Sequence, residues 1–346
     1  MIHRCQSVCG IALATTCLTF AGPANAQQQF GFFSGKVVTI AVGGGAGSGI
    51  DNGARMVSRY IGKYLPGDAD VRVQLLPGAG GIRLLEHLYS VAPKDGTYIG
   101  AFASGPILEP LLSQREVKYK TSDFTAVGAL DKDASLCVTW HQSPIKTIED
   151  AKRRELTVAG TGAASSTDIF PVVMNATIGT RFRVITGYLD TQQTIIAMER
   201  GETDGRCGWS WSSIRATKPD WVRDKRLNLL AQLGLEKHPD LPDVPLVLDL
   251  IQDETARQMM RVLVTPQDIT RPYLAPPGLS DARAAEVRGS FMKAVGDESL
   301  RAEFNKSVGE LPAPTSGEDM QKLLENIYAT PPAVIERLKE MLYPRK

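Results

Sequence analysis

The stretch KVVTIAVGGGAGSGID, residues 36–51, joins a run of β-branched residues to a series of glycines. Val37–Val42 has the composition and length of a buried β-strand, and Gly43–Gly49 is typical of a tight turn. The residues that follow repeat apolar side chains every three or four positions, as one face of a helix does: Val57, Tyr60, Ile61 and Tyr64. The stretch therefore predicts a strand, a glycine-rich turn and a helix in succession.

This strand and helix begin a longer alternation. Strands at 71–76 and 98–103, with a helix at 82–91 between them, complete a βαβαβ unit. A second unit begins near residue 136, and its expected strands lie at 136–140, 156–159, 182–185 and 206–209. One more strand at 269–274 precedes a helical tail that Ser280 caps. The pattern predicts an α/β chain with paired domains, each of which offers glycine turns at the carboxyl ends of its strands.

The first 26 residues have the features of a cleaved signal peptide. Arg4 precedes an apolar run from Val8 to Phe20, and Ala24-Asn25-Ala26 matches the small-x-small pattern of a cleavage site before Gln27. An N-terminal anchor is the less favoured alternative, because the apolar run is shorter than the ~20 residues that span a bilayer. We expect export to the periplasm.

The charges of the remaining chain balance. The whole sequence has 39 basic and 38 acidic side chains, and removal of Arg4 makes the two numbers equal. A neutral chain without a basic block offers no electrostatic surface for nucleic acid or for anionic lipid. We expect a soluble protein, monomeric, with no nucleic-acid partner.

Only two cysteines follow the expected cleavage site, Cys137 and Cys207. An oxidising compartment would allow them to form a disulfide. Two separate buried thiols are the favoured interpretation, because a chain of this size needs no covalent link for stability.

Glycine-rich turns before helices expose backbone N–H groups to an anion, and the helix dipole adds positive potential. Three such turns occur, at Gly43–Gly49, Pro77–Gly81 and Gly160–Thr167. The first does not match the dinucleotide fingerprint, nor the nucleotide P-loop, because Ile50 follows Gly49 where the P-loop has lysine. Asp51 is expected to cap the helix rather than to contact an anionic ligand.

Catalytic and metal-binding motifs are absent from the sequence. The histidines after the expected cleavage site, His87, His141 and His238, do not form a zinc-binding H-E-x-x-H pattern. The nucleophile elbow is also missing, since Gly208–Ser212 lacks its final glycine. We expect no cofactor, no metal and no enzymatic activity.

Four motifs together resemble the receptors of the tripartite tricarboxylate transporters, also called Bug proteins. They are Gly44–Arg55 with its Asp51-x-x-Ala54-Arg55, Pro77–Gly81, Asp95–Tyr98 and Gly201–Asp204. The resemblance implies a type II periplasmic-binding-protein fold, with two doubly wound α/β domains and a ligand cleft between them. It places domain 1 at residues 30–135 plus 268–346 and domain 2 at residues 136–267.

The resemblance also implies a function: capture of a small organic carboxylate, such as a di- or tricarboxylate or an aromatic acid, for the large and small membrane subunits of a transporter. A periplasmic sensor that presents the ligand to a signalling partner is the alternative. The expected ligand-binding residues are Gly44, Gly45, Ala46, Ser48, Asp51, Gly78, Ala79, Gly80, Ser104, Thr161, Gly162, Ala163, Ser165, Ser166, Tyr188, Asp190 and Trp209.

The sequence departs from the family pattern in the second domain. Ser166 stands near a position where many members have histidine, and Leu189 and Asp190 follow Tyr188 where a basic residue and glycine are frequent. For Asp190 a capping role is favoured over a ligand contact. For Trp209, core packing is favoured over stacking on the ligand.

Overall fold

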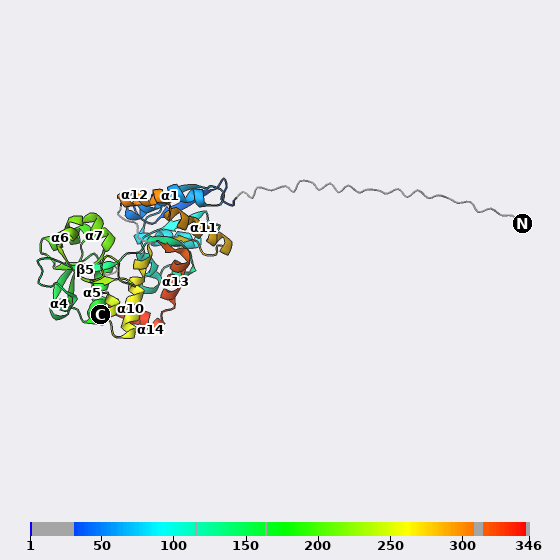
Figure 1. The fold of residues 1–346 in the computed structure, drawn as a ribbon. Coiled ribbons are helices and arrows are strands. Elements are labelled where there is room, and N and C mark those ends of the chain that lie inside the picture. The colour runs from blue at the N-terminus through cyan, green and yellow to red at the C-terminus, as the bar shows by residue number, and fades with distance from the viewer. Residues whose placement is uncertain (2–30, 115, 163–164, 308–313, 344–346) are drawn as a thin grey trace. The chain divides into compact units, whose positions relative to one another are not determined.

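The computed structural model describes Met1 and residues 31–114, 116–162, 165–307 and 314–343. Gly31–Lys346 forms one unit, and its strands make two mixed sheets (Figure 1). The expected signal peptide lies outside the described residues, as does Ala163. No helix of the described residues has the length and apolar character needed to cross a membrane.

The first sheet has the strand order β11-β4-β10-β3-β1-β2. Its parallel part consists of β1 (Val37–Val42), β2 (Asp70–Leu75) and β3 (Tyr98–Ala101), as the βαβαβ pattern predicts. Antiparallel strands extend it beyond β3: β10 (Thr270–Ala275), β4 (Thr125–Asp131) and β11 (Thr315–Ser316). The sequence pattern does not predict β4 and β11 as strands, although both pair within this sheet.

The second sheet has the order β7-β6-β8-β5-β9. It contains β5 (Ser135–Trp140), β6 (Leu156–Gly160), β7 (Phe182–Thr186), β8 (Gly205–Ser210) and β9 (Leu227–Leu233). β6 is parallel to β7 and to the central strand β8, and β5 is antiparallel to β8 and β9. Both sheets are therefore mixed sheets. All the strands expected from the sequence are present within one residue of the predicted bounds, except that β3 ends two residues early.

Helices pack on both sheets. Those that follow strands of the first sheet, or belong to the tail, are α1 (Gly49–Ile61), α2 (Ile82–Ser90), α3 (Glu109–Leu112), α11 (Asp281–Val295), α12 (Glu298–Ser307), α13 (Gly317–Tyr328) and α14 (Pro332–Leu342). Those within the second set are α4 (Ile148–Arg153), α5 (Ser166–Ile178), α6 (Thr191–Glu199), α7 (Trp211–Thr217), α8 (Pro219–Arg223), α9 (Val247–Leu250) and α10 (Glu254–Val264).

Two chain segments connect the sheets. Residues 132–134 lead from β4 to β5, and the 3-10 turn η5 (Thr265–Ile269) leads from α10 back to β10. The Asp133 N–H donates to the Gln267 carbonyl at 2.9 Å, which ties the two segments together. The last helix, α14, contacts α10, α5 and α3, so the tail packs against elements of the second set (Figure 1).

The three tryptophans after Asp204 lie in a buried cluster. Trp209, Trp211 and Trp221 pack with Leu136 and Ile214, and Trp209 is only 2% exposed. The Trp209 and Trp221 rings meet edge to face at 6.3 Å. This position favours the core-packing interpretation of Trp209 over a ligand contact.

The expectation of two separate thiols is wrong, because Cys137 and Cys207 form a disulfide. They lie on the neighbouring antiparallel strands β5 and β8, with their Cα atoms 3.9 Å apart. The size of the core decides whether a disulfide is needed, but strand pairing decides whether two cysteines face each other. That pairing joins residues 70 positions apart, which sequence spacing does not reveal.

Candidate ligand-binding site

The turns that follow β1, β2 and β3 meet at one edge of the first sheet. Val42, at the end of β1, pairs with Leu75 of β2 and with Ala101 of β3, so the three strands end together. The backbones beyond them approach closely: a Cβ at Gly43 would lie 3.1 Å from the Gly81 Cα and 3.3 Å from the Phe102 Cβ. Glycine at 43 permits this contact between the first turn and its two neighbours.

Side chains of α1 hold the first turn. Ser48 is the N-cap, and its hydroxyl accepts from the Asp51 N–H at 3.2 Å, so the prediction of Asp51 as the cap is wrong by three positions. The Asp51 carboxylate accepts from the Gly47 N–H at 2.8 Å and pairs with Arg55 Nε at 2.9 Å. Burial acts to raise the pKa of Asp51, but these two partners hold it below its usual value. Asp51 therefore closes the turn from inside, while Gly45 and Ala46 are exposed.

The second turn has unusual backbone geometry. Gly78, Ala79, Gly80 and Gly81 all have positive φ angles, and Ala79, at 47°, is the only one of the four with a side chain. A non-glycine residue in this region costs roughly 1–2 kcal/mol. Backbone strain of this kind persists only where the surrounding structure holds it in place, and it is frequent at ligand-binding sites.

A cavity of about 340 Å³ lies beside the turn that follows β3. Its wall contains Ser104, Gly105, Leu108, Glu109, Leu112 and Ser113 from the segment after β3, Ser165, Ser166, Ile169 and Phe170 from α5 and its N-cap, and Leu263, Pro266, Gln267 and Tyr343. Ser104, Ser165 and Ser166 are thus brought together from the two sheets' helical connections. Among the described residues, the lining contains no Lys, Arg or His, and Glu109 is its one carboxylate.

Hydroxyl and carboxylate groups of α5 close the glycine turn after β6. The Thr161 N–H donates to Thr167 Oγ1 at 2.9 Å, and the Gly162 N–H donates to Asp168 Oδ1 at 3.1 Å. The Ser165 hydroxyl contacts Asp168 Oδ1 at 3.2 Å. These two backbone N–H groups and the Ser165 hydroxyl are therefore engaged within the protein, and Ser166 adds a further hydroxyl to the cavity wall.

Other expected residues lie next to this turn but do not line the cavity. The Tyr188 N–H donates to the Gly160 carbonyl at 3.2 Å, which places Tyr188 beside the end of β6. Asp190 caps α6, since its carboxylate accepts from the Gln193 N–H at 2.9 Å. The capping role favoured from the sequence is therefore the one observed. Gly44, Gly45, Ala46, Ser48, Gly78, Ala79 and Gly80 are also absent from the cavity wall.

Sequence reasoning missed a buried positive charge in the second sheet. Arg206 is 2% exposed, and its Nη1 donates to Thr194 Oγ1 at 2.8 Å and to the Thr191 carbonyl at 3.4 Å. Burial lowers the pKa of Arg206 to about 10. Its partners are neutral oxygen atoms and the Trp209 ring, whose centroid lies 5.0 Å from Cζ. The guanidinium thus brings a fixed positive charge beneath the first turn of α6.

The remaining cavity residues gave no sequence signal. Phe170 and Leu263 occupy apolar helical positions that periodicity assigns to a core, and Gln267 and Tyr343 belong to segments far away in the chain. Among the described residues, no group of three His, Cys, Asp or Glu side chains is arranged to hold a metal ion.

Comparison with known proteins finds both similar sequences and similar solved structures. No protein-family model matches it. A UPF0065 protein of Bordetella bronchiseptica is 26% identical over 277 residues, which cover 76% of this chain and 78% of that protein. A UPF0065 protein from a tcbD-tcbE intergenic region of a Pseudomonas species is 23% identical over 254 residues, 72% of this chain and 71% of the relative.

Solved structures are similar over most of the chain. A TctC solute-binding protein from Polaromonas has a TM-score of 0.67 and 18% identity, with 87% of this chain and 98% of that one covered. MatC of Rhodopseudomonas palustris with bound malate has a TM-score of 0.59 and 17% identity, covering 88% and 98%. A second R. palustris protein, with adipate, has a TM-score of 0.59 and 17% identity, covering 88% and 96%. The chain therefore has the fold of the TctC-type periplasmic solute-binding proteins, which confirms at the level of the fold the resemblance carried by its sequence motifs.

Proposed function

We propose that this chain is a periplasmic solute-binding protein without catalytic activity, which captures a small organic acid and delivers it to the membrane subunits of a transporter. One observation carries the proposal: hydroxyl groups from both halves of the fold, Ser104 after β3 and Ser165 and Ser166 at the start of α5, line a single cavity. Its volume, about 340 Å³, lies at the lower end of the range for small-molecule sites.

The lining suits an acid with a hydrocarbon body. Serine hydroxyls and the N-terminal end of α5 favour a carboxylate, because they donate hydrogen bonds and the helix dipole is positive there. Leu108, Leu112 and Phe170 form an apolar wall for the body of the ligand. Glu109 repels a second negative charge near it but accepts a hydrogen bond, so we expect a hydroxyl or neutral group at that end.

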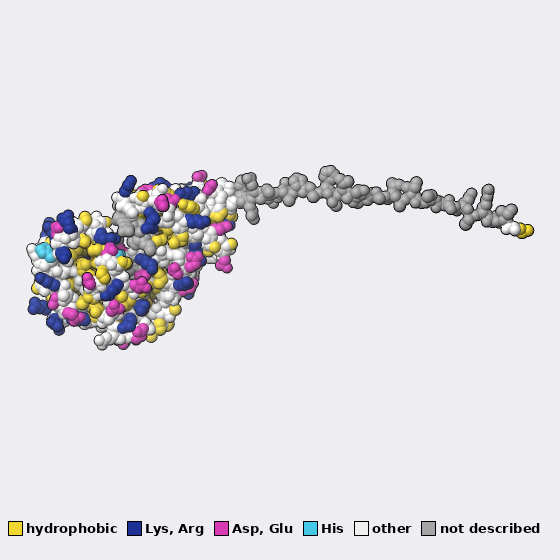
Figure 2. Space-filling view, in the orientation of Figure 1, with side chains coloured by type: hydrophobic (Ala, Val, Ile, Leu, Met, Phe, Trp, Pro, Cys, Tyr) yellow, Lys and Arg dark blue, Asp and Glu magenta, His cyan; other side chains and the backbone are white. Residues whose placement is uncertain are grey.

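Two further observations support the proposal. Similar solved structures hold malate or adipate, which are small organic acids. The disulfide between Cys137 and Cys207 fits an oxidising compartment such as the periplasm. Figure 2 shows basic and acidic side chains interleaved over the visible face, without a field of one sign that would favour a polyanionic partner.

A thermal-shift screen of residues 27–346 tests the function. The panel contains C4–C10 dicarboxylates, hydroxy acids, citrate and aromatic acids, and isothermal titration then measures the affinity of each compound that raises the melting temperature. We expect one chemical series to raise the melting temperature. A ligand at a hundredfold excess over its dissociation constant stabilises the folded protein by ~2.7 kcal/mol. If no acid in the panel raises the melting temperature, the proposal is contradicted.

Variants locate the bound acid. Ser104→Ala and Ser166→Ala each remove one hydroxyl from the cavity, and each is expected to weaken binding roughly three- to tenfold, as loss of one hydrogen bond does. Ser34→Ala, an exposed serine ahead of β1, is the control and should bind normally. Equal affinity in all three variants would place the ligand elsewhere. Uptake of the identified acid by cells with and without the gene separates transport from sensing.

A further inference from the structure

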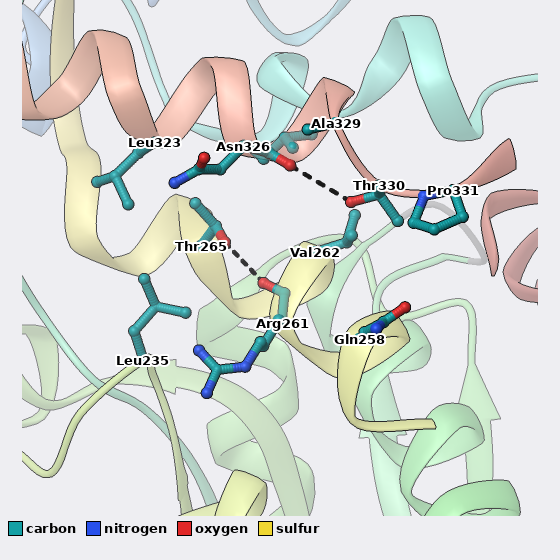
Figure 3. A pocket seen from close by; sticks show the side chains of 11 residues that line it. Leu235, Gln258, Arg261, Val262, Thr265, Leu323, Asn326, Ala329, Thr330 and Pro331 are labelled. Carbon is teal, nitrogen blue, oxygen red and sulfur yellow. Dashed lines mark hydrogen bonds between the residues drawn. The ribbon is translucent and has the colours of Figure 1, made fainter. Parts of the chain in front are cut away.

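A second pocket, of about 330 Å³, lies between α10 and the corner that joins α13 to α14 (Figure 3). Its lining shares no residue with the cavity at Ser104 and Ser166. Eleven residues form the wall: Leu235, Gln258, Arg261, Val262, Thr265, Leu323, Asn326, Ile327, Ala329, Thr330 and Pro331. The motifs quoted from the sequence include none of them.

The polar part of the wall offers hydrogen-bond donors and, among the described residues, contains no carboxylate. Arg261, Gln258 and Asn326 offer a guanidinium and two amides. The two threonine hydroxyls are directed to backbone carbonyls: Thr265 to Arg261 at 2.7 Å, and Thr330 to Asn326 at 3.5 Å (Figure 3). Without Asp or Glu in the lining, the Arg261 charge is not neutralised inside the pocket. The polar side therefore favours an anion.

The rest of the wall is apolar. Val262 of α10 and Leu323 and Ile327 of α13 belong to it, together with Leu235 and Pro331. Thr265 and Val262 are buried, whereas Arg261 is exposed, so the apolar floor lies below a charged rim. An inorganic ion would leave this floor in contact with water, whereas a ligand with a hydrocarbon part covers it.

We propose that this pocket is a second ligand-binding site, for a small organic anion with an apolar body, in which Arg261 provides the charge and Asn326 orients the anion. The arrangement is the reverse of the first cavity, where Glu109 is the charged side chain among the described lining residues. This inference does not depend on the function proposed above, because it rests on a different set of residues.

Benzoate and its uncharged isostere benzamide test the site. Binding is measured by chemical-shift titration of the full mature chain carrying Leu108→Trp, because Leu108 lines the first cavity and a larger side chain there reduces its volume. We expect saturable shifts from benzoate at α10 and at the α13–α14 corner, and at least roughly tenfold weaker binding of benzamide, which lacks the charge that Arg261 recognises. No saturable shift at these elements, or equal binding of both compounds, would overturn the proposal.

Variants assign the charge to Arg261. Arg261→Met is expected to weaken benzoate binding roughly tenfold or more, and Arg261→Lys less, since lysine keeps the charge without the planar fork. Arg337→Met is the matched control, because Arg337 is an exposed arginine on α14 outside the lining. Asn326→Ala gives a second variant if Arg261→Met does not fold. Normal benzoate affinity in folded Arg261→Met and Asn326→Ala would overturn the assignment.

Discussion

At the scale of single residues, Asp131 shows how the crossover between the sheets responds to pH. Its carboxylate is 1% exposed, pairs with Arg271 Nη1 at 2.6 Å and accepts from the Thr270 hydroxyl. Burial raises the pKa of Asp131 to about 6, although the Arg271 guanidinium opposes the rise. Arg271 has a φ of 51°, so this ion pair is held by a backbone in the left-handed region.

The sign of the pH effect follows from that pKa. In the unfolded chain Asp131 loses its proton near pH 4, whereas the folded protein keeps it until about pH 6. The folded state therefore binds more protons within this window, and the Asp131 contribution to stability decreases as pH rises from about 4 to about 6. We expect Asp131→Asn to remove this part of the pH dependence.

Urea unfolding between pH 4 and pH 6.5 measures the pH dependence of stability that Asp131 contributes. The free energy of unfolding of Asp131→Asn should fall less with rising pH than that of the unmodified protein, because an amide at position 131 does not titrate. Asp243→Asn, in an exposed loop, is the control and should keep the original pH dependence. Parallel curves for all three proteins would show that Asp131 does not titrate in this window.

Other residues show what sequence reasoning can and cannot predict. Serine and glycine positions that open helices carry local signals, so Ser104, Ser165 and Ser166 were predicted and are found at one cavity. Arg206 has no local signal, because its burial depends on α6 packing across β8. Trp209 was assigned to the ligand or to the core by residue type alone, and only its packing decides between them.

At the scale of elements, the periodicity of apolar residues and the position of turn residues predict the parallel strands and the helices between them well. Sequence reasoning misses β4 and β9, Thr125–Asp131 and Leu227–Leu233, because neither belongs to a strand–helix–strand alternation. Both are antiparallel neighbours of strands distant in sequence. The disulfide was missed for the same reason, because it depends on the pairing of β5 with β8.

The disulfide is expected to contribute strongly to stability. It closes a loop with a sequence separation of 70, for which chain entropy predicts roughly 4 kcal/mol. Cys137→Ser/Cys207→Ser should therefore melt roughly 10 °C lower in calorimetry. Thiol titration of denatured, unreduced residues 27–346 is expected to find no free thiol, since these are the only two cysteines there. Two titratable thiols, or an unchanged melting temperature, would contradict this prediction.

At the scale of the whole unit Gly31–Lys346, α10 links the two candidate sites. Val262 lines the pocket with Arg261, and the next residue, Leu263, lines the cavity with Ser104. One turn later, Thr265 lines the pocket and its neighbour Pro266 lines the cavity. The tail behaves similarly: Pro331, ahead of α14, lines the pocket, and Tyr343, after α14, lines the cavity. The two sites therefore share one helix and one tail segment, which provides a physical route for coupling between them.

We therefore predict thermodynamic coupling between the sites. The dissociation constant of the acid found in the screen should change at least roughly fivefold when benzoate saturates the second pocket, and the affinity for benzoate should change by the same factor when the acid is bound. Isothermal titration in both orders measures the two factors. Arg261→Met, which is expected to bind benzoate more weakly, should keep its affinity for the acid at benzoate concentrations that saturate the unmodified protein. If both ligands bind together with unchanged affinities, α10 does not transmit occupancy, and the two sites are independent.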